Sequence, residues 1–297
     1  MDAVSRLIFW QGDPARGVNG DTLDFLKNMN AGLKARHPSA LLIAEDSTAF
    51  PGVTRPVSEG GLGFDYKWDL GWMHDTLTYM QTPPDERAER RGQLLFSMEY
   101  FPNEHYLLPL SHDEVVHGKA AIVQKMWGAD LTDKYAQARA FYVYMFAHPG
   151  KKLNFMGNEL GLRVEWSESA ELDWTYIDGP FHTFFCALGK AYCEHPALHA
   201  DYLPDSFRWL PENLDAPCVF AWERRSSDEH LIAVCNFSDK PYEFETDLPA
   251  PTVLLNTDWE RFGGETKETT QSFNKISDRF SIKLAKFSAI LLKIDKN

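Results

Sequence analysis

His105-Tyr-Leu-Leu-Pro-Leu-Ser-His-Asp-Glu114 is an apolar run that ends abruptly in a polar, ionisable cluster. A short apolar run bounded by polar residues is typical of a strand buried within a sheet. The same arrangement occurs in residues 40–47, where Ala-Leu-Leu-Ile-Ala leads into Glu-Asp-Ser. It occurs again in residues 152–159, where Lys-Leu-Asn-Phe-Met leads into Gly-Asn-Glu. Three buried strands with polar ends are therefore expected in the first part of the chain.

Helical patterns lie between these predicted strands. Residues 22–35 carry leucines at helical spacing, and residues 135–146 are rich in alanine and aromatic residues. The second stretch ends before His148-Pro149-Gly150, a combination that stops helices. Strands that alternate with helices indicate a parallel sheet. The sequence therefore predicts repeated β/α units up to about residue 199.

The polar ends of the strands predict a functional rim. In a parallel β/α barrel, the catalytic groups lie at the carboxyl ends of the strands. Acidic residues at such positions also cap the helices that follow, and capping alone accounts well for one aspartate. It accounts less well for two acidic clusters, Glu45-Asp46 and Asp113-Glu114, that both follow apolar strands. We therefore favour a catalytic rim over a set of helix caps.

The pattern changes after about residue 200. Short apolar runs, separated by Ser, Asp, Gly and Pro, replace the β/α alternation. Several short strands at roughly ten-residue spacing are typical of an antiparallel sandwich. We therefore predict two domains, an α/β domain in residues 1–199 and a β-sandwich in residues 200–297. The expected strands of the sandwich are residues 218–222, 230–236, 252–256 and 287–294.

Composition narrows the classes of function. The chain has 297 residues, of which 44 % are hydrophobic and 25 % charged, as in ordinary globular proteins. Its net charge of −13 disfavours nucleic acids and anionic membranes as partners. The sequence has no apolar run long enough for a membrane span and no recognisable signal peptide, so we expect a cytoplasmic protein. Aromatic residues reach 13 %, which fits sugar stacking and an aromatic core equally well.

The four cysteines do not indicate a metal site. None of them has the C-x-x-C spacing of metal ligands. If Cys186 and Cys193 share a helix, they lie roughly 10 Å apart along it, which is too far for a disulfide. We expect all four to be buried thiols in a reducing compartment. No metal or organic cofactor is predicted.

Three acidic residues are spaced so that they could lie at the ends of successive strands and form one catalytic site. Retaining chemistry needs two carboxyl groups about 5–5.5 Å apart, one as nucleophile and one as acid/base. The intervals between Asp2, Glu45 and Asp113 each suit one or two β/α units, so all three are predicted to converge on one rim. Alternatives remain from the residues alone. Asp2 fits a frayed terminus, Glu45 a helix cap, and His112 a hydrogen-bonded core histidine.

Several longer motifs are more specific, and on them the sequence resembles bacterial glycogen branching enzymes of the α-amylase superfamily. Residues 42–53, Leu-Ile-Ala-Glu-Asp-Ser-Thr-Ala-Phe-Pro-Gly-Val, resemble the acid/base segment of that family. Residues 61–77 resemble the segment that follows it, and residues 110–119 the segment of the transition-state stabiliser. Phe155-Met-Gly-Asn-Glu159 and Asn256-Thr-Asp258 match as well. The resemblance extends over essentially the whole chain.

The resemblance implies a role for four residues. Asp2 matches the nucleophile, Glu45 the general acid/base and Asp113 the transition-state stabiliser. His112 matches a histidine that binds the sugar at the cleavage point. The implied reaction cleaves an α-1,4-glucan, holds the chain as an ester on Asp2, and transfers it to a 6-hydroxyl to make an α-1,6 branch. This chemistry needs no metal and no organic cofactor.

Neighbouring residues compete with these assignments. The resemblance implies that Asp46 and Glu114 are secondary to the acids beside them. Trp68, Trp72 and Trp166 are possible sugar platforms, and core packing is an equal alternative for each.

The sequence also departs from the family pattern. The family has an arginine two residues before the nucleophile, a position that precedes Met1 here. The resemblance therefore implies the second half of a (β/α)8 barrel, from the end of its fourth strand, and then a C-terminal β-sandwich. We expect Asp2 to lack an upstream anchor, and the chain alone to be inactive without a missing N-terminal half. The alternatives are a non-catalytic fragment or glucan-binding piece and, more weakly, an amylase-like hydrolase.

Overall fold

The computed structural model describes residues 1–210, 216–246, 251–270, 273–276 and 279–294. The chain divides into two compact units. The first unit comprises Met1–Thr76, Gln93–Pro109 and Gly150–Leu153. The second unit comprises Leu77–Gly92, Leu110–Pro149 and Asn154–Asn297.

A parallel sheet, almost all of it within the first unit, confirms the predicted β/α pattern. Its four strands run in the order β1-β2-β3-β4. Strand β3 is buried along its whole length, as its apolar sequence predicts. The strands are β1 (Ile43–Ala44), β2 (Tyr66–Trp68), β3 (Tyr106–Leu110) and β4 (Lys151–Asn154).

Strand β1 is shorter than the predicted strand at residues 40–44. The backbone N–H of Leu42 donates to the carboxylate of Asp65 at 2.6 Å, instead of to a neighbouring strand. Leu41 is 66 % exposed, so the apolar run begins outside the core. A side-chain acceptor has replaced the strand ladder at this point, which the apolar pattern alone did not predict.

The helices also agree with the predicted pattern. Helix α2 contains the predicted helix at residues 22–35, and α7 contains that at residues 135–146. Helix α1 packs beside α2 in the first unit, where Ile8 and Leu26 share a core cluster. The helices are α1 (Ser5–Ile8), α2 (Gly20–Arg36), α3 (Leu70–Gln81), α4 (Arg91–Leu95), α5 (Ser97–Tyr100), α6 (Ile122–Lys125), α7 (Leu131–Ala147) and α8 (Pro180–Glu194).

Two antiparallel sheets in the second unit form the predicted sandwich. One sheet has the order β5-β6-β7-β12-β9 and the other β10-β11-β8. Phe244 and Ile282 of the smaller sheet pack in one core cluster with Ile232 and Ile290 of the larger sheet. The strands are β5 (Phe207–Trp209), β6 (Val219–Arg225), β7 (His230–Asn236), β8 (Tyr242–Thr246), β9 (Pro251–Asn256), β10 (Asn274–Ile276), β11 (Arg279–Leu284) and β12 (Ser288–Ile294).

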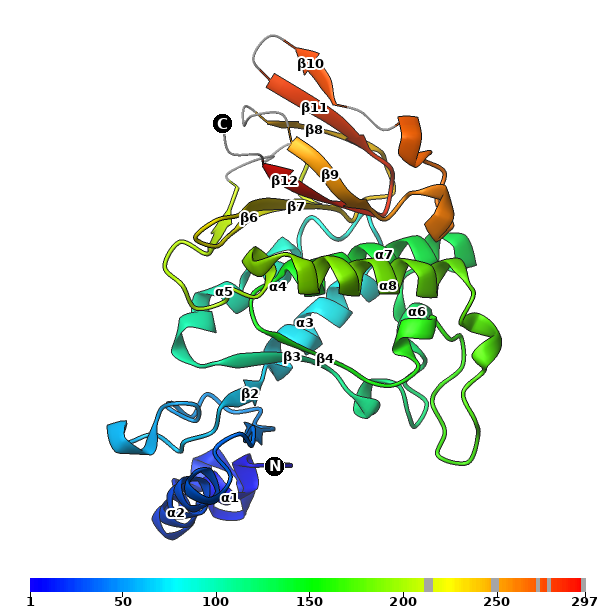
Figure 1. The fold of residues 1–297 in the computed structure, drawn as a ribbon. Coiled ribbons are helices and arrows are strands. Elements are labelled where there is room, and N and C mark those ends of the chain that lie inside the picture. Colours follow the sequence, from blue (N-terminus) through cyan, green and yellow to red (C-terminus); the bar gives the residue numbers. More distant parts are fainter. Residues whose placement is uncertain (211–215, 247–250, 271–272, 277–278, 295–297) are drawn as a thin grey trace. The chain divides into compact units, whose positions relative to one another are not determined.

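Helix α7 covers the other face of the larger sheet, and α8 packs beside α7 (Figure 1). Helix α7 is buried around most of its circumference, as expected for a helix with apolar residues on all sides. The Trp222 indole and the Arg224 guanidinium both donate to the carbonyl of Ala147, at 3.1 and 2.8 Å. Strands β6 and β7 are therefore buried along most of their length, which explains the apolar run of β7 and the apolar first half of β6.

The prediction that all four cysteines are buried is wrong for two of them. Cys218 and Cys235 are buried, but Cys186 and Cys193 are exposed on α8. Because α8 buries only one side, residues outside its Phe184–Leu188 face reach solvent. Among the helices of the described ranges, none has the length and apolar character to cross a membrane.

Candidate active site

The beginning of the chain lies beside β1. The Met1 amino group donates to the carbonyl of Ile43 at 2.7 Å, and the N–H of Glu45 donates to the Met1 carbonyl at 2.9 Å. The N–H of Val4 donates in turn to the Glu45 carbonyl at 2.8 Å. Bonds from one residue to two alternate residues of its neighbour are the pattern of a parallel ladder. The expectation that Asp2 lacks an anchor is therefore wrong, because backbone hydrogen bonds hold the residues on both sides of it.

Asp2 and Glu45 lie close together in the first unit. Ala3 has a φ of +45°, an unusual value for alanine. Its N–H donates to Glu45 Oε2 at 3.3 Å, so the Glu45 carboxylate lies against the backbone that follows Asp2. Asp2 is exposed and Glu45 half-buried. Both carboxylates of this pair are therefore accessible from solvent.

Asp46 is occupied by structural contacts. It is 2 % exposed, and its carboxylate forms an ion pair with the Lys67 ammonium at 2.8 Å. Its Oδ1 also accepts from the N–H and the hydroxyl of Thr48. Lys67 donates to the Thr48 carbonyl at 2.6 Å as well. This network stiffens the loop after β1 and leaves Glu45 as the accessible acid of the pair.

The acidic cluster after β3 divides in the same way. Glu114 is buried and accepts from the Ser111 N–H and hydroxyl at 2.6 and 2.9 Å, which closes a capping box with the N–H of Asp113. The side chains of Asp113 and His112 are 53 % and 56 % exposed and lie 3.5 Å apart. Glu114 therefore shapes the turn, and Asp113 is free to face a substrate.

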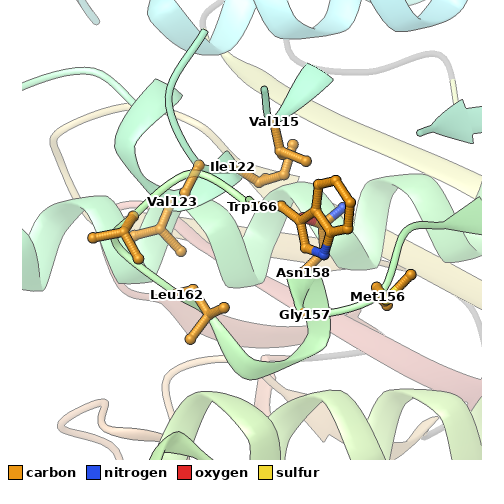
Figure 2. A pocket seen from close by; sticks show the side chains of 11 residues that line it. Val115, Ile122, Val123, Met156, Gly157, Asn158, Leu162 and Trp166 are labelled. Atoms are coloured by element: carbon orange, nitrogen blue, oxygen red, sulfur yellow. The ribbon is translucent and has the colours of Figure 1, made fainter. Parts of the chain in front are cut away.

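An aromatic cluster continues from His112 within the second unit. The His112 ring lies 5.9 Å from the Phe155 ring, and Phe155 lies 5.3 Å from the Trp166 ring in an edge-on arrangement. Trp166 also lines a small, mostly apolar pocket with Val115 and Asn158 (Figure 2). Among the described residues, the Asn158 side-chain nitrogen has no hydrogen-bond acceptor although it is buried. A hydroxyl or a water molecule would satisfy it.

A cleft in the first unit starts at the residue after Glu45. It encloses about 690 Å³ and is lined by Asp46 to Gly52, by the end of β2 and by α5. Phe50, Trp68, Phe96 and Tyr100 supply aromatic walls, and Arg55 supplies a charge. Aromatic faces combined with a few polar groups suit a sugar chain. This cleft was not predictable from the sequence, because its walls come from three separate segments.

Asp69 lies in the same cleft. It accepts from the Trp72 N–H at 2.8 Å and from the Tyr100 hydroxyl at 2.7 Å. Burial outweighs these bonds and raises the pKa of Asp69 to about 6. Asp69 belongs to the segment 61–77 that resembles the branching-enzyme family. Nothing in the sequence of that segment predicts the hydrogen bond from Tyr100 to Asp69.

The three tryptophans considered as sugar platforms, Trp68, Trp72 and Trp166, have different environments. Trp72 is 1 % exposed and belongs to the core, which excludes it as a sugar platform. Trp68 and Trp166 are half-buried beside the cleft and the pocket respectively. Of these three tryptophans, Trp68 and Trp166 have the exposure that stacking against a sugar ring requires.

The predicted site residues form two local groups. Asp2 and Glu45 lie together in the first unit, and His112 and Asp113 lie together in the second. In each of the pairs Glu45-Asp46 and Asp113-Glu114, the accessible acid is the one that the resemblance marks as catalytic. The convergence of the two groups on one rim stays a prediction.

Comparison with solved structures defines the fold class. The chain superposes on an α-amylase from H. orenii with a TM-score of 0.66 at 15 % identity, covering 96 % of this chain and 59 % of the other. It superposes on a Nostoc punctiforme debranching enzyme with a TM-score of 0.66 at 16 % identity, covering 94 % and 55 %. Residues 209–295 match the family described as "Alpha amylase, C-terminal all-beta domain". The fold is therefore that of the α-amylases, with part of a (β/α)8 barrel followed by a β-sandwich.

Sequence comparison gives the family. The chain is 43 % identical to the 1,4-alpha-glucan branching enzyme GlgB of Cupriavidus necator, covering 89 % of this chain and 38 % of that protein. It is 40 % identical to GlgB of Geobacillus stearothermophilus, covering 89 % and 43 %. The chain thus spans about two fifths of the length of these relatives. It belongs to the GlgB branching-enzyme family and corresponds to a C-terminal part of a GlgB protein.

Proposed function

We propose that this chain carries the acid/base and stabiliser half of a 1,4-α-glucan branching enzyme. The observation that supports this most strongly is the division of both acidic clusters. In each one, a buried carboxylate is tied to the local backbone, and the adjacent carboxylate is accessible. The buried members serve local structure, Glu114 in a capped turn and Asp46 in an ion pair with Lys67, so we assign catalysis to the accessible Glu45 and Asp113.

The proposed mechanism is a double displacement. Asp2 attacks the anomeric carbon of an α-1,4-glucan while Glu45 protonates the leaving oxygen. The cleaved chain is held as an ester on Asp2. Glu45 then removes the proton from an incoming 6-hydroxyl, whose oxygen attacks the anomeric carbon and releases the Asp2 carboxylate. Asp113 stabilises the positive charge that develops on the sugar ring, and His112 donates a hydrogen bond to a sugar hydroxyl. Glu45 recovers from the 6-hydroxyl the proton that it gave to the leaving oxygen, and Asp2 ends as a free carboxylate.

We propose that the glucan occupies the cleft beside Glu45. Its aromatic walls offer faces for pyranose rings, and its polar groups offer partners for hydroxyls. The capped turn at Ser111 and the ion pair of Asp46 hold the two acids in place, since a misplacement of about 1 Å can reduce a rate a hundredfold.

The proposal includes the predicted organisation of the chain. It places the catalytic part in residues 1–199 and the sandwich in residues 200–297, and it requires a partner that supplies the remaining barrel strands. The two exposed thiols, Cys186 and Cys193, are compatible with a reducing compartment, and we propose a cytoplasmic location on that basis.

A chimaera tests the function. The part of GlgB from Geobacillus stearothermophilus that precedes the matched region is fused ahead of residue 1, and α-1,6 linkages formed from amylose are counted by linkage analysis. We expect branching by the chimaera and none by the 297-residue chain alone. The chimaera with Asp113→Asn is the contamination control and should be inactive.

The outcomes separate the rival functions. Release of reducing sugars without new branches would favour an amylase-like hydrolase. A folded chimaera that binds amylose but forms no linkage would favour a non-catalytic, glucan-binding piece. Branching that persists in the Asp113→Asn control would contradict the assignment of the stabiliser.

A further inference from the structure

A second cavity lies in the second unit, among α7, the start of α8 and the turns at Trp174–Tyr176 and Glu260–Phe262. It encloses about 330 Å³, within the range of small-molecule sites. Its walls are largely apolar and aromatic: Leu131, Tyr135, Leu160, Tyr176, Phe181 and Phe262. None of the residues proposed for catalysis lines it.

Arg139 supplies a charge to this apolar cavity. The residue is only 4 % exposed, and its Nε donates to the Thr257 carbonyl at 2.8 Å. Among the described residues, its two terminal nitrogens have neither a hydrogen-bond acceptor nor an ion-pair partner. Burial lowers the pKa of Arg139 to about 10, and the charge of Asp258 offsets this only partly. A buried cation of this kind is costly unless an anion pairs with it.

Among the described residues, no carboxylate forms an ion pair with the Arg139 guanidinium. Asp258 is the carboxylate whose charge acts on Arg139, but its two oxygens accept from the Glu265 N–H and the Thr266 hydroxyl of its own loop. Asp133, on the same helix as Arg139, forms an ion pair with Lys286 at 2.7 Å. The donors of Arg139 are therefore available to a ligand.

The amino end of α8 adds positive potential at the same place. The helix has 15 residues, starts with Pro180, and has no side-chain cap and no acidic residue in its first turn. Such an end favours anions, because its first N–H groups lack partners and the helix dipole is positive there. Gly179, Pro180 and Phe181 all line the cavity.

Gly263 keeps space open between the Arg139 guanidinium and the amino end of α8. Gly263 has a φ of +83°, and a Cβ at this position would lie 3.5 Å from Pro180 and 3.8 Å from Arg139 Nη1. A side chain here would therefore occupy the gap between the guanidinium and the end of α8. The absence of one leaves room for a small group that contacts both.

We propose that this cavity binds a small organic anion. Its carboxylate or phosphate pairs with the terminal nitrogens of Arg139 at the start of α8. Its flat or aliphatic body lies against the cavity wall that Tyr135, Phe181 and Phe262 form. A bidentate contact of guanidinium with an oxyanion is stronger than a neutral hydrogen bond, so the charge determines selectivity and the apolar walls add affinity. The ligand class follows from the charge, since a neutral glucan would leave Arg139 unpaired.

The test measures binding of three matched probes to the 297-residue protein by isothermal titration calorimetry. Benzoate and phenyl phosphate carry the two possible oxyanions on the same ring, and benzamide is the neutral counterpart of benzoate. We expect one or both anions to bind at least tenfold more tightly than benzamide. Equal affinities for benzoate, phenyl phosphate and benzamide would overturn the proposal.

Two kinds of variant locate the binding. Arg139→Met removes the charge at similar volume and should weaken anion binding at least tenfold. The Arg139→Met variant also loses the hydrogen bond to the Thr257 carbonyl, so a second test is needed that leaves the core unchanged. Leu131 provides it, because this residue lines the cavity and is exposed. Leu131→Glu should weaken anion binding severalfold, and Leu131→Lys should strengthen it. Anion affinity that is the same in the two Leu131 variants would contradict this site, as would displacement of benzoate by maltoheptaose.

Discussion

Lys67 and Asp46 form a buried ion pair in which the ammonium and the carboxylate lie 2.8 Å apart with almost no solvent contact. The pair joins the end of β2 to the loop that carries Glu45. Replacing Lys67 with Met should leave Asp46 buried and unpaired, at a cost of about 3–5 kcal/mol in unfolding free energy. Urea denaturation measures this change.

The double variant Lys67→Met, Asp46→Asn is the matched control for this pair. It removes both charges, so it should recover much of the loss. A double variant as unstable as Lys67→Met alone would show that the charge imbalance is not the cause.

Glu45→Gln should abolish branching in the chimaera, because an amide cannot donate and retrieve a proton. General acid/base catalysis typically contributes a factor of about 10²–10⁴. Asp46→Asn keeps an acceptor for Thr48 and should retain far more activity than Glu45→Gln once its folding is verified. The measurement is loss of iodine staining of amylose. An inactive, folded Asp46→Asn variant beside an active Glu45→Gln variant would reverse the assignment.

Asp69 should make stability depend on pH. Because burial raises the pKa of Asp69 from its ordinary value of 3.8 to about 6, the folded state holds a proton that the unfolded chain releases. This contribution is present at low pH and is lost as pH rises through about 6. Asp69→Asn keeps an acceptor for Trp72 and Tyr100 but does not ionise. Between pH 4 and 7 the wild type should therefore lose up to about 3 kcal/mol relative to the variant. Stability curves that stay parallel in denaturation experiments at each pH would refute this.

Thiol labelling should distinguish the cysteines. Burial raises the pKa of Cys218 and of Cys235, and both side chains are inaccessible in the folded protein. Maleimide should therefore modify only Cys186 and Cys193 under native conditions, and all four in denaturant. Mass spectrometry of peptides identifies the sites. Rapid native labelling of Cys235 would be inconsistent with the packing of β7 against α7.

Much of this architecture could be predicted from the sequence, because apolar runs report burial directly. The run at residues 105–110 is the strand β3, and the run at residues 230–236 is β7. Contacts between distant segments were not predictable in this way. The bond from Tyr100 to Asp69, the ladder between Met1 and β1, and the position of Arg139 depend on tertiary packing and leave no periodic pattern.

The candidate site shows the same limit. The motifs distinguished Glu45 from Asp46 by resemblance, and the physical difference between them lies in the position of Lys67. In the same way, Glu114 differs from Asp113 because Ser111 begins a short turn that needs a buried acceptor. The exposure of Cys186 and Cys193 was not predictable from the lack of metal-site or disulfide spacing, because it depends on which side of α8 faces the core.

The carbonyl of Ala147 accepts hydrogen bonds from both Trp222 and Arg224 of β6, and the buried β7 and β12 lie against α7. The larger sheet thus has one face in the sandwich core and the other against the helical layer. Amide protons of α7 and β7 should then exchange with solvent in one cooperative opening event, at a single free energy. A chain cut near residue 200 would leave α7 and the sheet each with an uncovered apolar face, so the two halves are expected to aggregate when separated and to reassociate when mixed.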